Sequence, residues 1–192
     1  MKTLEFFVTD EWWPACKKRN LAPKTLEDYS TTVEIYLLKE WGHYTLDEID
    51  VPLIHKIWNR LADKYSPDRA HRTLGKLSMI LRAAKRRRYI AFNAVEDARP
   101  ELPTLERKEP DPLTIEQTLQ LLATVETHRL CVLYHLAITL GLRLGELLGL
   151  QWGDIDWKER TLTIRRQVQE VHGKLEVKLG AKTNAGNRVL PL

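Results

Sequence analysis

The stretch that decides the fold is Ile138-Thr-Leu-Gly-Leu-Arg-Leu-Gly-Glu-Leu-Leu-Gly-Leu-Gln-Trp-Gly-Asp-Ile155, in which one arginine interrupts a largely apolar segment. A helical pattern ends at Gly141 and starts again around Arg143, with Glu146 one helical turn further on. At this spacing the carboxylate can orient the guanidinium and leave its planar fork available for a phosphate. On spacing alone, an ordinary ion pair at a helix start is the more common interpretation.

Downstream of this stretch the apolar pattern changes to strict alternation. Three segments alternate and are predicted to form one small antiparallel sheet, with turns at His172-Gly173 and around residues 182–186. These segments are residues 161–168, 174–178 and 187–192. Upstream, Thr114 and Gln117 form a capping box that predicts a helix with its apolar side chains inside. Those side chains are Ile115, Leu119 and Leu122.

Further upstream, residues 1–98 are predicted to form a compact domain of four amphipathic helices. The first spans about residues 3–19, and the second opens at Pro23. The third follows Asp50, and the fourth begins at Ser66-Pro67, a cap and first-turn pair. Residues 99–112 contain several prolines and alternating charges and are predicted to be a semi-rigid linker to a second domain, 113–192.

Charge is distributed unevenly between these parts. Residues 1–100 contain 18 Lys and Arg against 14 Asp and Glu, whereas residues 101–192 contain 12 of each, so the net charge of +4 lies in the first half. Eight basic residues and no acid lie between Arg69 and Arg88. Such a stretch is typical of a surface that binds a phosphate backbone. By itself it is equally consistent with a solvated helix face.

The composition narrows the class of protein. The chain has 192 residues, 43% of them hydrophobic, and no apolar stretch approaches the length of a membrane span. The N-terminal residues do not resemble a secretory signal, so we expect a cytoplasmic globular protein. Cys16 and Cys131 lie in apolar helical contexts and are expected to be core residues. The six histidines show no metal-ligand spacing, so no metal is expected.

Taken together and in this order, the motifs resemble the tyrosine recombinases, the phage integrase family. The run around Arg143 is similar to the first arginine box of that family. The segment Gly180-Ala-Lys-Thr-Asn-Ala-Gly-Asn-Arg-Val-Leu-Pro-Leu192 is similar to the strand-turn-strand segment that carries its catalytic lysine, which falls on Lys182. The four upstream helices resemble the family's core-binding domain, although Ala94 stands where a proline is usual.

The resemblance spans nearly the whole chain and implies a fold. That fold is mainly α with a small antiparallel β-sheet: a four-helix, SAM-like core-binding domain followed by the first half of an α+β integrase catalytic domain. It also implies site-specific recombination of double-stranded DNA through a phosphotyrosyl intermediate. Because the bond energy is kept in that intermediate, no cofactor is expected.

The resemblance further assigns site residues. Arg143 would clamp the scissile phosphate, Glu146 would orient Arg143, and Lys182 would protonate the leaving 5'-oxygen. Candidates for contact with the DNA backbone come from the second and fourth helices. They are Lys24, Thr25, Tyr29, Arg69, Arg72, Lys76, Arg86 and Arg87.

The family's nucleophilic tyrosine, its His-x-x-Arg box and its further His or Trp belong after residue 192. All six tyrosines of the chain precede Arg143, and the nearest, Tyr134, lies on an apolar helix face. A chain of these residues is therefore expected to bind DNA without cutting it, with self-association on DNA in the full-length form. Two alternatives stay open: a truncated DNA-binding regulator or competitor derived from a mobile element, and a helical adaptor whose basic face binds an acidic protein.

Overall fold

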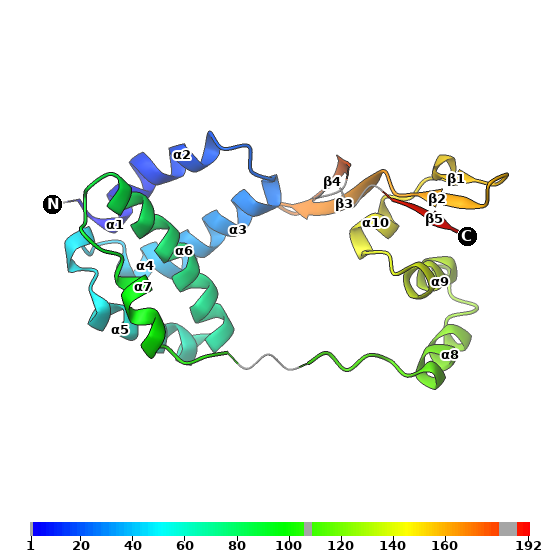
Figure 1. The fold of residues 1–192 in the computed structure, drawn as a ribbon, viewed down its shortest axis with the longest axis horizontal. Helices are drawn as coiled ribbons and strands as arrows, with labels where there is room; N and C mark the ends of the chain where they lie inside the picture. Colours follow the sequence, from blue (N-terminus) through cyan, green and yellow to red (C-terminus); the bar gives the residue numbers. More distant parts are fainter. Residues whose placement is uncertain (1, 106–108, 181–187) are drawn as a thin grey trace. The chain divides into compact units, whose positions relative to one another are not determined.

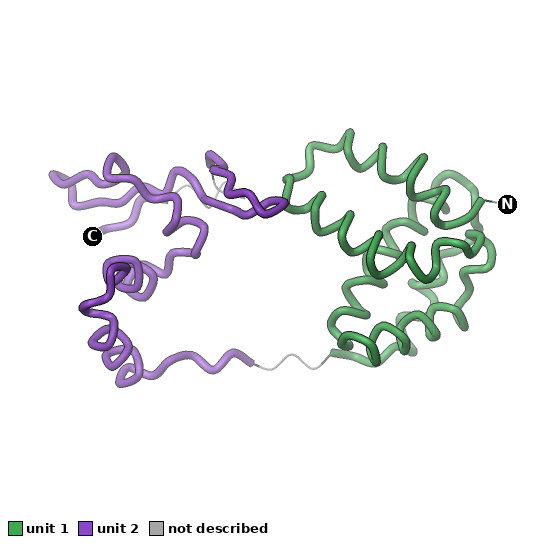
Figure 2. The backbone as a smooth tube through the Cα atoms, turned by 180° about the vertical axis from the view of Figure 1, so that it is seen from behind, with its two compact units in different colours: residues 1–107 green, residues 108–192 purple. Residues whose placement is uncertain are grey.

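The computed structural model describes residues 2–105, 109–180 and 188–192. The chain divides into two compact units, Met1–Arg107 and Lys108–Leu192, shown in separate colours in Figure 2. The first unit is helical, and the second combines short helices with β-strands (Figure 1). The predicted fold class, mainly α with a small antiparallel β component, is confirmed.

The first unit contains the four predicted helices. The first two are each interrupted by one π-helical segment, whereas the third and fourth are regular. In chain order, the elements are α1 (Leu4–Phe7), π-helical Val8–Trp12, α2 (Trp13–Lys17), α3 (Pro23–Val33), π-helical Glu34–Leu38, α4 (Lys39–Trp41), a 3-10 turn (Leu46–Glu48), α5 (Val51–Lys64) and α6 (Pro67–Arg86).

Side-chain caps explain where these helices begin. Thr3, Asp50 and Ser66 each accept a hydrogen bond from a backbone N–H of the first turn of α1, α5 and α6, respectively. Proline occupies the first turn of α5 and α6, where its missing N–H would have had no partner in the helix. The helices then pack through their apolar faces, and α5 lies against α6. Phe7, Leu37 and Ile54 are among the fully buried side chains of this core.

The first unit extends past the boundary predicted from the sequence. Helix α7 (Ala94–Ala98) packs against α5 and α6, and a 3-10 turn (Arg99–Glu101) follows it directly. Leu102 packs on the core, so the predicted linker of residues 99–112 begins too early. The prolines of that stretch were interpreted as linker composition, but Pro100 lies inside the 3-10 turn, a position that proline tolerates.

In the described part of the second unit, three α-helices and a 3-10 turn (Trp152–Asp154) precede the strands. The α-helices are α8 (Ile115–Thr124), α9 (Cys131–Leu140) and α10 (Leu144–Leu148). The capping box of Thr114 and Gln117 is present as predicted. The inward placement is wrong for Ile115 and Leu119, which are 76% and 62% exposed, whereas Leu122 is half-buried. Helix α8 packs on α9, and that contact leaves these two side chains uncovered.

The strands of the described residues form two small sheets and not the single sheet predicted. Their bounds are β1 (Ile155–Asp156), β2 (Thr161–Thr163), β3 (Arg166–Val171), β4 (Lys174–Leu179) and β5 (Val189–Pro191). Strands β1, β2 and β5 form one antiparallel sheet, and β3 and β4 form a hairpin that turns at His172-Gly173. The predicted strand 161–168 is broken because Ile164 and Arg165 carry the chain from the first sheet into the hairpin.

The core of the second unit is small. Its buried residues are Leu142, Leu147, Leu162 and Ile164, which join the start of α10 to the strand region. None of the helices in the described ranges is both long enough and apolar enough to cross a membrane.

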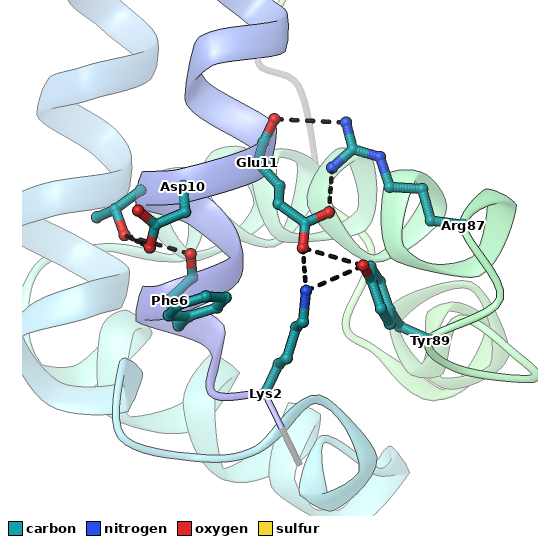
Figure 3. Close-up of polar contacts among 7 residues, drawn as sticks. Lys2, Phe6, Asp10, Glu11, Arg87 and Tyr89 are labelled. Carbon is teal, nitrogen blue, oxygen red and sulfur yellow. Dashed lines mark hydrogen bonds and ion pairs between the residues drawn. The ribbon is translucent and has the colours of Figure 1, made fainter.

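A polar cluster fastens the N-terminal helix of the first unit to the end of α6 (Figure 3). Glu11 pairs with Lys2, accepts a hydrogen bond from Tyr89 at 3.0 Å, and accepts another from Arg87 Nη1 at 2.7 Å. The hydrogen bond from Lys2 is the main cause that lowers the pKa of the Glu11 carboxyl below its ordinary value. The ionised carboxylate therefore stabilises the folded unit.

We expect Glu11→Gln to lower the melting temperature of the protein at neutral pH. Because the folded-state pKa of Glu11 is depressed, its contribution is present above the unfolded pKa of about 4.3 and is lost as pH falls through the folded value. The difference in melting temperature between wild type and variant should therefore shrink on acidification. Thermal unfolding followed by circular dichroism across this pH range provides the measurement.

The matched control is Glu5→Gln, which removes an exposed carboxylate from α1, at the start of the same helical segment. Its effect on the melting temperature should be small at every pH. A Glu11→Gln difference that stays constant down to the acid limit would contradict the role of the charge.

Candidate functional site

The segment around Arg143 has the geometry that its sequence predicts. Helix α9 ends at Gly141, which adopts a left-handed conformation with φ of 60°. Leu142 is buried and anchors the turn, and Arg143 is the residue that precedes α10. The Arg143 backbone N–H donates to Glu146 Oε2 at 3.0 Å, so Glu146 closes the first turn of the helix.

Two glycines allow α10 to approach the hairpin closely. A Cβ atom on Gly145 would lie 2.7 Å from the carbonyl oxygen of Val168 in β3. A Cβ atom on Gly149 would lie 3.0 Å from the carbonyl oxygen of Arg166. The glycines at this helical spacing therefore set the distance between α10 and the backbone of β3.

The carboxylate of Glu146 is shared by two arginines. Arg143 Nη1 donates to Oε1 at 3.1 Å, and Arg188 donates to both oxygens, from Nη1 at 3.2 Å and from Nη2 at 3.0 Å. The side chain of Glu146 is 5% exposed, that of Arg188 26% and that of Arg143 76%. We call these three residues the arginine site.

The charge of Glu146 depends on both arginines. Burial acts to raise the pKa of its carboxyl, but the hydrogen bonds from Arg188 and from the backbone and side chain of Arg143 outweigh burial. The pKa consequently lies below its ordinary value, and the carboxylate stays ionised. It holds Arg143 at one edge while most of that side chain faces solvent.

A second buried carboxylate lies beyond the other end of α10. Asp154 accepts two hydrogen bonds from Arg166, at 2.7 and 3.0 Å, and Arg166 also donates to the Gly149 carbonyl at 3.3 Å. Sequence reasoning missed this pair. The neighbouring Trp152 and Trp157 are 81% and 71% exposed, so they add little packing to the turn.

Lys182, the predicted catalytic lysine, lies outside the described residues. Gly180 and Arg188 flank the segment that contains Lys182, and both are hydrogen-bonded to residues that directly follow β2. Gly180 N–H donates to the Arg165 carbonyl at 2.8 Å, and Ile164 N–H donates to the Arg188 carbonyl at 2.9 Å. The chain therefore leaves and re-enters the described structure at neighbouring points, and the second point is Arg188 of the arginine site.

In the first unit, the predicted DNA-binding residues of α3 and α6 lie against each other. Lys76 lies 4.2 Å from the centre of the Tyr29 ring and pairs with Asp28 at 2.8 Å. Arg69 lies 4.8 Å from the centre of the Tyr36 ring. These cations are therefore held by aromatic rings that extend from the second predicted helix.

The remaining candidates of that region are more exposed. Arg72 pairs with Asp68 at 2.8 Å and is 69% exposed, and Lys24 pairs with Glu27 at 2.8 Å. Thr25 is half-buried in the first turn of α3. Arg69, Arg72 and Lys76, spaced three and four residues apart, share one side of α6, which we call the α6 face.

The last two candidates lie at the other end of α6, about 25 Å from Arg69 at 1.5 Å per residue. Arg86 is exposed and forms no ion pair within the described ranges. Arg87 is engaged with Glu11 in the cluster of Figure 3 and lies 5.4 Å from the centre of the Phe7 ring. The structure therefore does not join Arg86 and Arg87 to the α6 face.

Comparison with family models covers both units of the chain. The model of the phage integrase central domain matches residues 7–101, and the model of the phage integrase family matches residues 112–186. The chain belongs to the phage integrase family, the tyrosine recombinases.

Individual relatives and structures agree with this assignment. The integrase of Saccharopolyspora erythraea is 29% identical over 169 residues, and a XerC-like tyrosine recombinase of Caldanaerobacter subterraneus is 31% identical over 126 residues. The Tn1549 transposon integrase in complex with circular intermediate DNA has a TM-score of 0.83 at 17% identity over 100% of this chain. A lambda integrase tetramer bound to a Holliday junction has a TM-score of 0.72 at 22% identity over 95% of this chain.

The chain corresponds to part of each relative. The matched regions are 84% of this chain and 38% of the Saccharopolyspora integrase, and 62% of this chain and 32% of the XerC-like recombinase. The chain covers 61% of the transposon integrase chain and 52% of the lambda integrase chain.

The arginine site also contains a residue, Arg188, that sequence reasoning did not assign. Arg188 lies in residues 180–192, the segment that resembles the family's lysine region, in which the resemblance assigns a role to Lys182. The available signal was a basic residue directly before an alternating apolar strand. Its partner, Glu146, lies 42 positions earlier, so no local spacing rule connects the two.

We expect Gly145→Ala to destabilise the second unit, because its new methyl group would meet the Val168 carbonyl at 2.7 Å. Overpacking of this kind costs about 1–3 kcal/mol. An alanine inside a helix would otherwise favour folding by up to about 1 kcal/mol, so a loss of stability isolates the clash. Chemical denaturation of the two proteins measures the difference.

Gly153→Ala is the control, since nothing lies within 4 Å of the Cβ position there. This variant should stay within about 0.5 kcal/mol of wild type. Equal stability of Gly145→Ala and wild type would show that α10 does not depend on the close approach to β3.

Proposed function

We propose that this chain provides the DNA-binding domain and the first part of the catalytic domain of a site-specific DNA recombinase. The observation that carries the proposal is the state of Arg143: a buried carboxylate orients its guanidinium, and its side chain is nevertheless 76% exposed. A cation held in this way can bind the nonbridging oxygens of a phosphodiester without first reorganising.

In the first unit, we assign the α6 face to the DNA backbone. Tyr29 and Tyr36 contact Lys76 and Arg69 without neutralising them, because an aromatic ring attracts a cation through its quadrupole and carries no net charge. Lys76 is also paired with Asp28 at 2.8 Å. We assign Lys24 and Thr25, in the first turn of α3, to contact with the same DNA backbone. Contacts of this kind fix the orientation of the duplex and carry little sequence information.

The proposed reaction is a transesterification. A tyrosine oxygen from outside residues 1–192 attacks the phosphorus, so that a phosphotyrosyl bond forms and the bond to the 5'-oxygen breaks. Arg143 would stabilise the negative charge on the nonbridging oxygens during this step. Lys182 would give a proton to the departing 5'-oxygen, and that hydroxyl could later attack a second phosphotyrosyl bond.

Assembly on DNA belongs to the same proposal. A polypeptide limited to residues 1–192 would bind duplex DNA but form no covalent link, because all six of its tyrosines precede Arg143. Strand exchange requires two cleaved sites, so the complete recombinase would act as several copies on paired DNA sites. The lambda integrase tetramer on a Holliday junction supports this part of the proposal.

We expect replacement of Arg69, Arg72 and Lys76 together by alanine to weaken binding to any duplex sequence. The slope of log affinity against log salt should become shallower by up to about one unit for each DNA phosphate that the variant no longer neutralises. Fluorescence anisotropy with two unrelated duplexes over a range of salt concentrations tests this expectation.

The matched control removes the same charge from exposed positions outside α6, with Lys18, Lys39 and Lys56 replaced by alanine. If both triple variants lose affinity equally, net charge and not the α6 face explains the binding. An unchanged salt slope in the first variant would place the DNA elsewhere.

In a recombinase polypeptide that continues through the nucleophilic tyrosine, Arg143→Lys and Lys182→Ala should differ in their response to the leaving group. Removing one oriented charge donor costs on the order of 3 kcal/mol, or about a hundredfold in rate. Arg143→Lys should stay slow on every substrate, because an ammonium cannot reproduce the bidentate fork. Lys182→Ala should recover when sulfur replaces the bridging 5'-oxygen, since a thiolate leaves without a proton.

Cleavage rates on the two substrates, measured with suicide duplexes on denaturing gels, separate these roles. Wild type provides the reference ratio between oxygen and sulfur substrates. If Lys182→Ala is equally slow on both, Lys182 is not the acid and binds the backbone instead.

A further inference from the structure

The strongest unassigned feature is the position of Arg188 at the start of β5. Its two terminal nitrogens donate to the two oxygens of Glu146 at 3.2 and 3.0 Å, in the two-point geometry that guanidinium and carboxylate groups favour. The Arg188 backbone carbonyl accepts from Ile164 N–H at 2.9 Å, which fixes the residue beside β2. The guanidinium and the backbone carbonyl of Arg188 are therefore both fixed by hydrogen bonds.

The contact matters because Glu146 is buried. Taking a carboxylate out of water costs several kcal/mol unless it is paired and hydrogen-bonded, and otherwise the group takes up a proton. Arg143 contributes one side-chain hydrogen bond to this carboxylate, whereas Arg188 contributes two. The orientation of the exposed Arg143 therefore depends on the charge of Glu146. The half-buried Arg188 contributes most of the side-chain hydrogen bonds that keep this charge.

We propose that Arg188 is the positioning residue of the phosphate site: it keeps Glu146 ionised and fixed, so that Glu146 can orient Arg143. The inference rests on the proposed function, in which Arg143 meets the scissile phosphate. Arg188 itself is not assigned to contact the phosphate, because both of its terminal nitrogens donate to Glu146 and its side chain is only 26% exposed.

No other described charge substitutes for Arg188. Within the described ranges, the groups that contact the Glu146 carboxylate are Arg143, from the start of α10, and Arg188, from the start of β5. Strand β3 also packs on α10, but its Arg166 is bound to Asp154 at 2.7 Å. Among the described residues, loss of Arg188 would therefore leave Arg143 alone to oppose the effect of burial on Glu146.

The test is a titration of the Glu146 carboxyl carbon by NMR in the 192-residue chain, without DNA. In wild type the midpoint should lie below that of an ordinary glutamate, as the hydrogen bonds from both arginines imply. In Arg188→Gln the midpoint should move to higher pH, and it should move further than in Arg143→Gln. The backbone hydrogen bond from Arg143 persists in the latter variant, and so does the pair with Arg188.

Two further variants keep the result interpretable. Arg188→Lys retains the charge but not the two-point geometry, so the Glu146 midpoint should lie above that of wild type and below that of Arg188→Gln. If Arg188→Gln fails to fold, the rise above wild type in Arg188→Lys still tests the proposal. Arg165→Gln removes an exposed neighbouring arginine whose closest carboxylate contact is 3.9 Å, and should leave the midpoint unchanged.

A Glu146 midpoint that is the same in Arg188→Gln and wild type would overturn the proposal, and so would a larger shift in Arg143→Gln. Because no DNA is present, these outcomes do not depend on the proposed function. Failure of the α6 face to bind DNA would leave them unaffected.

Discussion

The buried carboxylate of Glu146 is the constraint around which the second unit is arranged. A charge in that position is tolerated only with hydrogen-bonded partners of opposite sign, and the fold supplies them from two distant parts of the chain. One partner, Arg143, precedes α10, and the other, Arg188, precedes β5. The same carboxylate thus joins a helix to a strand and directs an exposed guanidinium toward solvent.

The two units surround their cations differently. In the first unit, tyrosine rings contact Arg69 and Lys76, and Lys76 also pairs with Asp28, so the positions are restrained and the positive potential of the α6 face is only partly reduced. In the second unit, the buried carboxylate of Glu146 orients Arg143 through a hydrogen bond of 3.1 Å. An oriented cation is needed to stabilise the charge that develops on a single phosphate. Net positive potential is needed to attract a long phosphate backbone.

The features that could be predicted from the sequence are those set by local spacing. The caps at Asp50 and Ser66, the prolines after them and the apolar stripes give the helices of the first unit. Arg143 and Glu146 are one turn apart, so their contact was also predictable. Each of these depends on residues within a few positions of one another.

The features that were missed depend on distant residues or on the space around them. Alternation continues unbroken through residues 161–168, and nothing local shows that Ile164 bonds with Arg188 and moves the chain from one sheet to another. The apolar face of α8 has the pattern of a buried helix, yet Ile115 is 76% exposed, because the pattern specifies what a helix could bury and not what covers it.

Helix α10 shows why the missed contacts are as important as the predicted ones. A helix of five residues is too short to be stable by itself, because nucleation costs more than so few backbone hydrogen bonds return. It is held at both ends by arginines of the strand region: Arg188 binds Glu146 in its first turn, and Arg166 binds the Gly149 carbonyl at its last turn and Asp154 beyond it. The position of Arg143, and with it the proposed phosphate site, therefore follows from tertiary contacts of β3 and β5 and not from the propensity of its own segment to form a helix.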